Sequence, residues 1–335
     1  EIAQCLVGSE MCIRDRAHKM GMDPVKVKEM NMPIEGGPLP GYPDVPYAQS
    51  CSMDRCMARA KEMMDWDSKY PCRDMGNGKV RGVGVAMAMQ GSSIAGVDVG
   101  GADIKLNEDG SYTLALGCTD MGTGCDTVMA QIAADCLNTP MDNIVVFSVD
   151  TDISPYDSGS YASSTTYATG NAVIQACGEL RKRIHAFGAQ MLGVSAEESD
   201  FDGEKVYSVK EERSISLKDI ANNAMCYSNH TLTATAKEKT PVSPPPYMAG
   251  AVEIELDKET GHVEIIDYAT CVDCGTVINP ALATVQTEGG LVQGIGMALY
   301  EDVQYDKRGR ILNDSFMQYK IPTRLDMGKI CLLYT

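Results

Sequence analysis

The sequence predicts an α+β fold built from two related halves, and three observations support that prediction. In residues 102–118, apolar and polar residues alternate on both sides of an Asn-Glu-Asp-Gly turn, as in a β-hairpin, and a Gly-Thr-Gly turn and a helical pattern follow. The same order returns with strand patterns at 249–257 and 261–270, an Asn-Pro turn and a helical pattern at 280–299. A Rossmann unit is not expected, because the strand before the Gly-Thr-Gly turn belongs to a hairpin and no G-x-G-x-x-G follows it.

The remaining elements are expected from periodicity and from turn residues. The N-terminal part is expected to contain a short helix at 17–32 with a turn at Asp23-Pro24, a Pro/Gly connector at 33–47, a helix at 50–65 and a small-residue strand at 80–90. After the Gly-Thr-Gly turn we expect a helix that carries Val128, Ile132 and Cys136, a strand at 143–149, and a polar loop at 150–170 before a long helix. A Pro-rich linker at 240–246 and a last strand with a turn at 306–309 complete the expected elements.

Both ends of the chain are expected to be foreign to the natural protein. The stretches LVGSEMCIRDR (6–16) and CLLYT (331–335) match the translated ends of a sequencing adapter, and residues 1–5 fit the index part of that adapter. The natural segment would then be truncated on both sides. The predicted division is adapter at 1–16, a helical connector at 17–75, a first α+β half at 76–240, a second at 241–330, and adapter at 331–335.

Composition excludes several classes of partner. The chain of 335 residues has a formal net charge of -17, which is unfavourable for binding nucleic acid or an anionic membrane surface. No apolar run is long enough to span a bilayer. We therefore expect neither a nucleic-acid nor a membrane partner.

The 13 cysteines are scattered, which favours a reducing cytoplasm with mostly free thiols. Cys271 and Cys274 are the exception, since they form a C-x-x-C pair of the kind found in redox and metal sites. No second pair stands at metal-ligand spacing and the four histidines are dispersed, so structural thiols are favoured. A non-catalytic or thiol-redox role of this pair is the alternative from another class of function.

Three loops invite a ligand. In residues 121–124, two glycines permit close backbone approach, and the helix that follows offers unpaired N–H groups at the positive end of its dipole. Residues 160–170, SYASSTTYATG, place several hydroxyls before a helix, and residues 278–299 form a glycine-rich helix with Gln286 and Gln293. Each has an ordinary alternative: a tight turn, a serine-rich helix cap and helix packing, respectively.

Taken together and in this order, the loops resemble the molybdenum-binding large subunit of the xanthine dehydrogenase and aldehyde oxidase family. The matching stretches are GVAMAMQGS, TDMGTGCDT, DTDISPYDSGSYASSTTY and DCGTVINP, followed by Q, EGG and QGIGMAL, and they are most similar to bacterial xanthine dehydrogenases. The resemblance covers nearly all of the natural segment. It implies the molybdenum cofactor-binding domain of that family, with two related α+β halves. It also implies a molybdopterin with one molybdenum, usually as the cytosine dinucleotide in bacteria.

The resemblance further implies which residues form the site. The residues expected to hold the pterin and its phosphate are Met121, Gly122, Thr123, Gly124, Tyr161, Ala162, Ser163, Ser164, Thr165 and Gln286. The molybdenum itself would be held by the pterin. Ser92 and Ser93 match positions that face the substrate. The chain departs from the family at two places: relatives often have glutamine at the position of Thr123, and purine-hydroxylating relatives often have phenylalanine at one of the two serines.

The implied activity is hydroxylation of a purine, xanthine or hypoxanthine, with oxygen from water. In the family, electrons pass through [2Fe–2S] clusters and FAD to an acceptor such as NAD. An aldehyde or another N-heterocycle is the alternative substrate. No ferredoxin-type cysteine spacing or flavin fingerprint occurs here, so separate iron–sulfur and FAD-binding subunits are the expected partners. The family's general-base glutamate would lie past residue 330, so no catalytic residue is assigned and the chain alone is expected to be inactive.

Overall fold

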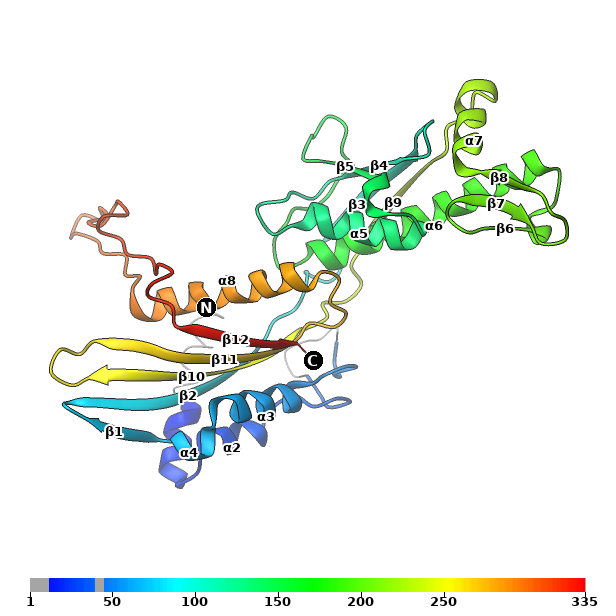
Figure 1. Cartoon of the computed structure of the whole chain (residues 1–335). Coiled ribbons are helices and arrows are strands. Elements are labelled where there is room, and N and C mark those ends of the chain that lie inside the picture. The colour runs from blue at the N-terminus through cyan, green and yellow to red at the C-terminus, as the bar shows by residue number, and fades with distance from the viewer. Residues whose placement is uncertain (1–11, 40–44, 335) are drawn as a thin grey trace. The chain divides into compact units, whose positions relative to one another are not determined.

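The structure, a computed structural model, describes residues 12–39 and 45–334, which divide into two compact units (Figure 1). Unit 1 contains the described residues up to Gln90 and from Pro245 onward, and unit 2 contains Gly91–Pro244. Most of the expected N-terminal adapter, part of the expected Pro/Gly connector and the last residue lie outside the described residues. None of the described helices has the length and apolar composition needed to cross a membrane.

Unit 1 is built on a five-stranded sheet in the order β1-β2-β10-β11-β12 (Figure 1). Its strands are β1 (Cys72–Gly76), β2 (Lys79–Met89), β10 (Tyr247–Asp257), β11 (Val263–Asp273) and β12 (Lys329–Tyr334). Strands β1, β2, β10 and β11 pair antiparallel with their neighbours, whereas β12 joins β11 in parallel. The predicted strands at 80–90, 249–257 and 261–270 are confirmed as β2, β10 and β11.

Helices cover both faces of this sheet. Successive residues of β10 point to opposite sides, so neighbouring residues of this strand pack against different helices. Ala251 packs in one core with α3 (Met53–Met64), and Val252 packs in a second core with Ile295 of α8 (Pro280–Leu299). Small residues line the first face of β10, so the methionine-rich helix α3 can approach the strand closely. The predicted helices at 50–65 and 280–299 are therefore confirmed.

Helix starts in unit 1 follow their local capping residues. Asp23 accepts a hydrogen bond from the Val25 N–H at 2.8 Å before Pro24 opens α2 (Pro24–Glu29), and Asn279 caps α8 by accepting from the Leu282 N–H at 3.0 Å. One helix at 17–32 was the wrong expectation. Residues 12–20 form a separate helix, and Gly21 with a φ of 64° breaks the chain before α2. The short helix α4 (Trp66–Lys69) follows α3 directly.

Unit 2 contains a four-stranded sheet in the order β5-β4-β3-β9, packed against α5 and α6 (Figure 1). These elements are β3 (Val99–Leu106), β4 (Tyr112–Leu116), α5 (Cys125–Leu137), β5 (Ile144–Ser148), α6 (Thr165–Leu192) and β9 (Thr233–Lys239). Burial alternates along β3 and β4, as expected for a hairpin with one face in the core. The predicted hairpin, the helix after the Gly-Thr-Gly turn, the strand at 143–149 and the long helix are confirmed.

Residues 193–232 had no element assigned from sequence beyond the long helix. They form a small three-stranded sheet of β6 (Ser199–Phe201), β7 (Lys205–Ser208) and β8 (Ser214–Ser216), followed by α7 (Leu217–Asn222). Strands of three or four residues carry too few positions for a periodic signal, which explains why the sequence did not reveal them.

The structural division differs from the predicted one at 76–240 and 241–330. Strand β2, expected in the first half, pairs with β10 along its full length from Lys79↔Asp257 to Met89↔Tyr247. The units therefore separate at 90/91 and at 244/245, because strand pairing holds β2 in unit 1. Residues 331–334, interpreted as adapter, lie in β12. The adapter interpretation stays a prediction. At 306–309 the predicted turn is present, with a single bridge between Tyr305 and Ile311 where a strand was expected.

Candidate functional site

Three of the predicted site segments converge within unit 2. The Ser160 hydroxyl accepts a hydrogen bond from the Thr119 N–H at 3.3 Å and donates one to the Thr119 carbonyl at 3.2 Å. The Ser93 N–H donates to the Ala162 carbonyl at 2.8 Å. These contacts bring the segment of Ser92 and Ser93, the Gly-Thr-Gly loop and the hydroxyl-rich loop to one place.

The close approach of these segments depends on glycines. A Cβ on Gly117 would stand 2.3 Å from the Pro155 carbonyl oxygen and 2.5 Å from the Cβ of Asp157. A Cβ on Gly101 in β3 would stand 2.4 Å from the Tyr156 carbonyl oxygen. Side chains at these two positions would push the segment at 155–157 away from the strands, so glycine is required there.

The Gly-Thr-Gly loop already holds an anion, and that anion is the side chain of Asp120. The Asp120 carboxylate accepts from the N–H groups of Gly122 at 2.8 Å, Gly124 at 3.1 Å and Asp126 at 3.4 Å. Gly122 and Gly124 adopt φ values of 102° and 76°, which aim their N–H groups inward. Partial burial acts to raise the pKa of Asp120, but the backbone hydrogen bonds outweigh it and lower that pKa.

This arrangement changes the expectation for residues 121–124. We expected their N–H groups to face a ligand, whereas the structure directs those of Gly122 and Gly124 to Asp120. The sequence signal was the aspartate two residues before the first glycine, since Asp side chains commonly bind the backbone two residues on. Thr123 is exposed. Met121 is 63% exposed.

The second loop leaves a helix N-terminus uncapped. Ser164 is the N-cap of α6, but its side chain makes no capping bond, and its hydroxyl lies 3.5 Å from the Gly159 carbonyl oxygen instead. The serine-rich cap, the ordinary alternative for this loop, therefore does not describe Ser164. Because helix α6 has 28 residues, its first N–H groups offer an anion a full dipole end.

Backbone strain also gathers at this loop. Ala162 and Ser163 have φ values of 51° and 55°, and Ser93 has a φ of 82°, all in a region that non-glycine residues rarely adopt. Ser93 is 5% exposed, and its hydroxyl finds no hydrogen-bond partner among the described residues. A strained backbone and an unsatisfied buried hydroxyl are features that cluster at binding sites.

Asp98 acts on the polar end of Tyr161. The nearby buried carboxylate of Asp98 raises the pKa of Tyr161. Asp98 also accepts from the Ile94 N–H at 2.7 Å. One carboxylate therefore connects the segment after Ser93 with the hydroxyl-rich loop.

Exposed apolar side chains accompany these polar loops. In the three segments and the chain around them, the large apolar residues open to solvent are Ile94, Val97, Met121, Ile153, Tyr156 and Tyr161. Such a group of exposed apolar residues is typical of a surface that a ligand or another part of a protein covers. With the uncapped helix and the hydroxyls, it suits a polar ring system that carries an anionic group.

Asp120, Cys125 and Asp126 place one ligand atom each within 4.8 Å of one another. Internal hydrogen bonds account for this grouping, because Asp120 holds the loop N–H groups and Asp126 accepts from the Ser148 hydroxyl at 3.1 Å. We assign no metal to it.

Gln286, the predicted cofactor residue of the third segment, lies in unit 1 on α8 and is exposed there, as is Gln293. The contacts that unite the other segments belong to unit 2 and do not involve this helix.

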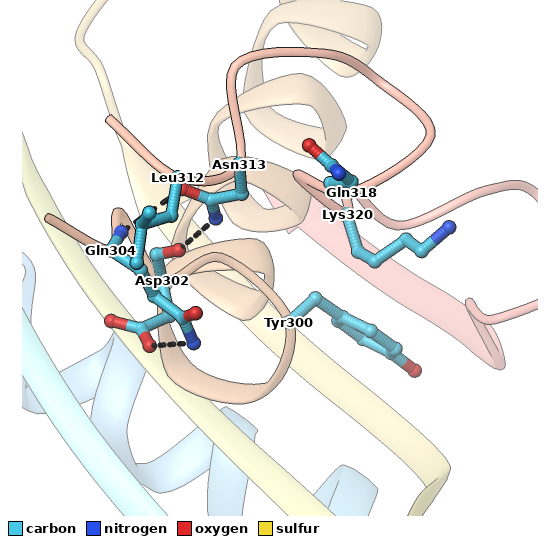
Figure 2. Close-up of a pocket in the computed structure, with 7 residues that line it drawn as sticks. All are labelled: Tyr300, Asp302, Gln304, Leu312, Asn313, Gln318 and Lys320. Carbon is cyan, nitrogen blue, oxygen red and sulfur yellow. Dashed lines mark hydrogen bonds between the residues drawn. The ribbon is translucent and has the colours of Figure 1, made fainter. Parts of the chain in front are cut away.

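Unit 1 also contains a polar pocket of about 370 Å³ that the sequence did not suggest (Figure 2). It is lined by Tyr300, Asp302, Gln304, Leu312, Asn313, Gln318 and Lys320. Asn313 accepts from the Gln304 N–H at 3.0 Å and donates to the Asp302 carbonyl at 2.5 Å. Lys320 donates to the Met317 carbonyl at 2.7 Å. Asp302, Gln304 and Asn313 therefore bind one another and shape one wall of the pocket.

The C-x-x-C pair is not arranged as a reactive dithiol. Cys271 is buried in β11, whereas Cys274 is exposed. Desolvation of the sulfur atom raises the pKa of Cys271, and it also raises that of Cys274, although Cys274 as a whole residue is exposed. A redox pair of this type needs a lowered thiol pKa, so the geometry does not support the thiol-redox alternative at these positions.

Comparison with known families identifies the class of protein. Residues 59–328 match the family model described as the molybdopterin cofactor-binding domain, and the chain belongs to that family. Within it, the chain is part of a molybdenum-binding subunit of the xanthine dehydrogenase and aldehyde oxidase type.

Three curated relatives illustrate the range of this family. The chain is 31% identical over 338 residues to the putative xanthine dehydrogenase molybdenum-binding subunit XdhA of Escherichia coli K12, covering 98% of the chain and 44% of the relative. It is 33% identical to the probable hypoxanthine oxidase XdhD of the same organism, covering 93% and 33%. It is 29% identical to the nicotine 6-hydroxylase large subunit of Paenarthrobacter nicotinovorans, covering 94% and 41%. The chain thus spans less than half the length of these relatives.

Solved structures agree on the fold. Carbon monoxide dehydrogenase from Oligotropha carboxidovorans superposes with a TM-score of 0.85 at 22% identity, covering 99% of this chain and 44% of that one. Quinoline 2-oxidoreductase from Pseudomonas putida 86 superposes with a TM-score of 0.83 at 23% identity, covering 98% and 44%. The α+β fold is therefore that of molybdenum hydroxylase large subunits.

Proposed function

We propose that this chain is the cofactor-holding part of a molybdenum hydroxylase catalytic subunit whose substrate is a purine, xanthine or hypoxanthine. The uncapped N-terminus of α6, beside the strained residues Ala162 and Ser163, is the observation that carries the proposal. The names of two relatives, a xanthine dehydrogenase subunit and a hypoxanthine oxidase, support the substrate class.

In unit 2, the start of α6 fits the anionic part of such a cofactor, whereas the Gly-Thr-Gly loop does not. The N–H groups at the start of α6 and the hydroxyls of Ser163 and Thr165 would hold its anionic part, since these hydroxyls make no side-chain hydrogen bond among the described residues. Asp120 would repel a phosphate at the Gly-Thr-Gly loop. We therefore assign to residues 121–124 a contact through the exposed side chain of Met121, and the anion to α6.

Other parts of the proposal concern the complete enzyme. When bound, the molybdopterin supplies the redox centre that takes electrons from the substrate. We propose the cytosine dinucleotide form, a contact from Gln286, and substrate-facing positions for Ser92 and Ser93. Iron–sulfur and FAD-binding subunits are the proposed partners, in the cytoplasm. The unsatisfied hydroxyl of Ser93 supports its role, because a bound ring would give it a partner.

The first experiment measures the cofactor in protein from the gene recovered with its flanking DNA and expressed in a host that makes molybdopterin. Molybdenum per chain and released nucleotide are quantified for wild type and for Ser163→Asp. The added charge at the start of α6 should lower molybdenum content at least about tenfold through anion repulsion.

Asn229→Asp is the matched control. It adds the same charge in unit 2, at an exposed position with a φ of 49° that aspartate tolerates. Equal molybdenum loss in both variants, or none in either, would contradict the assignment of the anion to α6.

A second experiment tests the substrate. The same protein is assayed for kcat/KM with xanthine, hypoxanthine, an aromatic aldehyde and a pyridine. We expect the purines to lead by at least about tenfold, which corresponds to about 1.4 kcal/mol of transition-state stabilisation. A preference for the aldehyde or the pyridine would favour the alternative substrate classes, with the cofactor assignment unaffected.

A further inference from the structure

The polar pocket of unit 1 carries opposite charges on its two sides (Figure 2). Asp302 and Gln304 lie on one side, whereas Tyr300, Gln318 and Lys320 lie on the other. Asp302 and Lys320 do not form an ion pair with each other, and neither forms one with another residue in the part of the chain that the structure describes. A space of about 370 Å³ therefore contains one negative and one positive group that both lack a counter-charge.

The side of Asp302 is held in place by hydrogen bonds. The Asn313 side chain accepts from the Gln304 N–H at 3.0 Å and donates to the Asp302 carbonyl at 2.5 Å. The Leu312 N–H donates to the Gln304 carbonyl at 2.8 Å. The Gln304 side chain also donates to Asp302 Oδ2 at 3.1 Å. That bond uses one acceptor site of the carboxylate, so Asp302 keeps acceptor sites for a cationic group.

The side of Lys320 is held in place through Tyr319, which stands between Gln318 and Lys320 in the sequence. The Tyr319 hydroxyl donates to Glu301 Oε2 at 2.5 Å. Glu301 lies against α8, since a Cβ on Gly296 would stand 2.1 Å from Glu301 Oε1. Both sides of the pocket are therefore fixed by contacts within unit 1 and need no ligand to form.

Three groups on the side of Lys320 are available to an anion. The Lys320 ammonium donates to the Met317 carbonyl at 2.7 Å, which leaves two of its three N–H groups. The side chains of Gln318 and Tyr300 make no hydrogen bond with any described residue. The Tyr300 ring packs against the core that contains Ile295, so its position is fixed as well.

We propose that this pocket binds a small zwitterion, a molecule in which a short carbon chain joins an ammonium group to a carboxylate. The ammonium lies at Asp302, the carboxylate lies at Lys320 and Gln318, and the carbon chain lies on the Tyr300 ring. Asp302 repels a simple anion and Lys320 repels a simple cation, so a molecule with both charges fits the pocket better than a molecule with one.

The experiment titrates the 335-residue chain by isothermal calorimetry at low ionic strength, where exposed charges are screened least. The probes are glycine, 4-aminobutyrate and 6-aminohexanoate, which carry the same two charges at increasing separation. We expect the best of the three to bind with a Kd of about 1 mM or tighter. The amine and the carboxylic acid of the same chain length have one charge each, and they should bind about three- to tenfold more weakly.

Variants on the two sides test the charge assignment. Lys320→Met and Asp302→Asn each remove one charge, and each should weaken binding of the best zwitterion about three- to tenfold. An amide in place of Asp302 can still accept from Gln304, so that side of the pocket should persist. Lys307→Met and Asp314→Asn are the matched controls, because they remove the same charges at exposed positions of the same segment that do not line the pocket.

Two results would overturn the proposal. The first is no saturable binding of any of the three zwitterions up to about ten times the expected Kd. The second is equal binding by the pocket variants and their controls. The singly charged analogues are compared on the wild-type chain, so equal binding of analogue and zwitterion would contradict the proposal even if a variant does not fold.

The proposal is independent of the proposed function, because the titration needs no molybdenum. A chain that binds a zwitterion but no molybdenum would contradict the proposed function alone. A chain that binds molybdenum but no zwitterion would contradict only the assignment of this pocket.

Discussion

The role of Asp120 follows from the backbone N–H groups that point toward its carboxylate. Four residues of chain turn around its carboxylate, and the glycines at 122 and 124 make that turn possible. The loop at 121–124 is thus folded around an internal anion. Because the hydrogen bonds lower the pKa of Asp120, its stabilising effect depends on pH.

Asp120→Asn should lower the free energy of unfolding by about 1–2 kcal/mol at pH 7, because the N–H groups lose a charged acceptor. The unfolded pKa of an aspartate is about 3.9 and the folded one is lower, so the contribution is complete above about pH 5. It is lost as the pH falls through the folded pKa. Urea unfolding of wild type and variant at pH 7 and pH 3 measures this, and a difference that grows at pH 3 would contradict the assignment. Asp142→Asn, an exposed change on the same unit, is the control.

Gly117 and Gly178 offer a matched pair for the packing of the loops. Gly117→Ala should destabilise by about 1–3 kcal/mol, since its Cβ would overlap the Pro155 carbonyl. Gly178→Ala, within α6 and with no atom within 4 Å of its Cβ, should stabilise by about 0.5–1 kcal/mol. Thermal unfolding of both variants measures the two signs. Equal effects would mean that the loop at 155–157 does not depend on Gly117.

At the scale of elements, β10 holds unit 1 together because it pairs on both sides and packs on both faces. It also carries a charged contact. Glu253, with 3% of its side chain exposed, pairs with Lys69 of α4 at 2.7 Å and with Arg73 of β1. The carboxylate therefore ties an edge strand and a short helix to the centre of the sheet.

Glu253→Gln should cost about 1–3 kcal/mol, because it leaves two partly exposed cations without their counter-charge. Glu62→Gln is the control, since Glu62 pairs with Arg59 at the surface, where an ion pair contributes at most about 1 kcal/mol. The urea unfolding midpoints of the two variants show whether the Glu253 ion pairs stabilise the protein more than the Glu62 pair does. Similar midpoints would mean that the Glu253 contacts add nothing beyond a surface pair.

At the scale of the whole molecule, unit 1 leaves large apolar side chains open around the segment that follows α8. Phe316, Met317 and Leu325 are 81%, 85% and 96% exposed. Exposed apolar side chains of this size are typical of a surface that another protein surface covers.

The chain alone should therefore associate through this surface. Changing Phe316 and Leu325 together to serine should lower light scattering at equal concentration, with the unfolding free energy within about 0.5 kcal/mol of wild type. Tyr227→Ser, at a residue 78% exposed in unit 2, serves as the control and should leave scattering unchanged. Unchanged scattering in the double variant would contradict the prediction.

Local patterns along the sequence predicted the longer helices and strands and identified the family. Hairpin alternation at 102–118, the Asn279 cap and the period of α8 are local signals, because the residues that create them are neighbours along the chain. The loop motifs identified the family for the same reason.

Which distant segments meet followed from how the elements pack. This packing placed β2 beside β10 across the intervening residues 90–246 and brought Ser93 to Ala162. In the structure the N–H groups of the Gly-Thr-Gly turn donate to Asp120, whereas the sequence predicts a ligand there. Contacts between distant residues depend on how whole elements pack. They also depend on which hydrogen-bond donors that packing leaves unpaired. A single sequence has no local pattern that predicts these two properties.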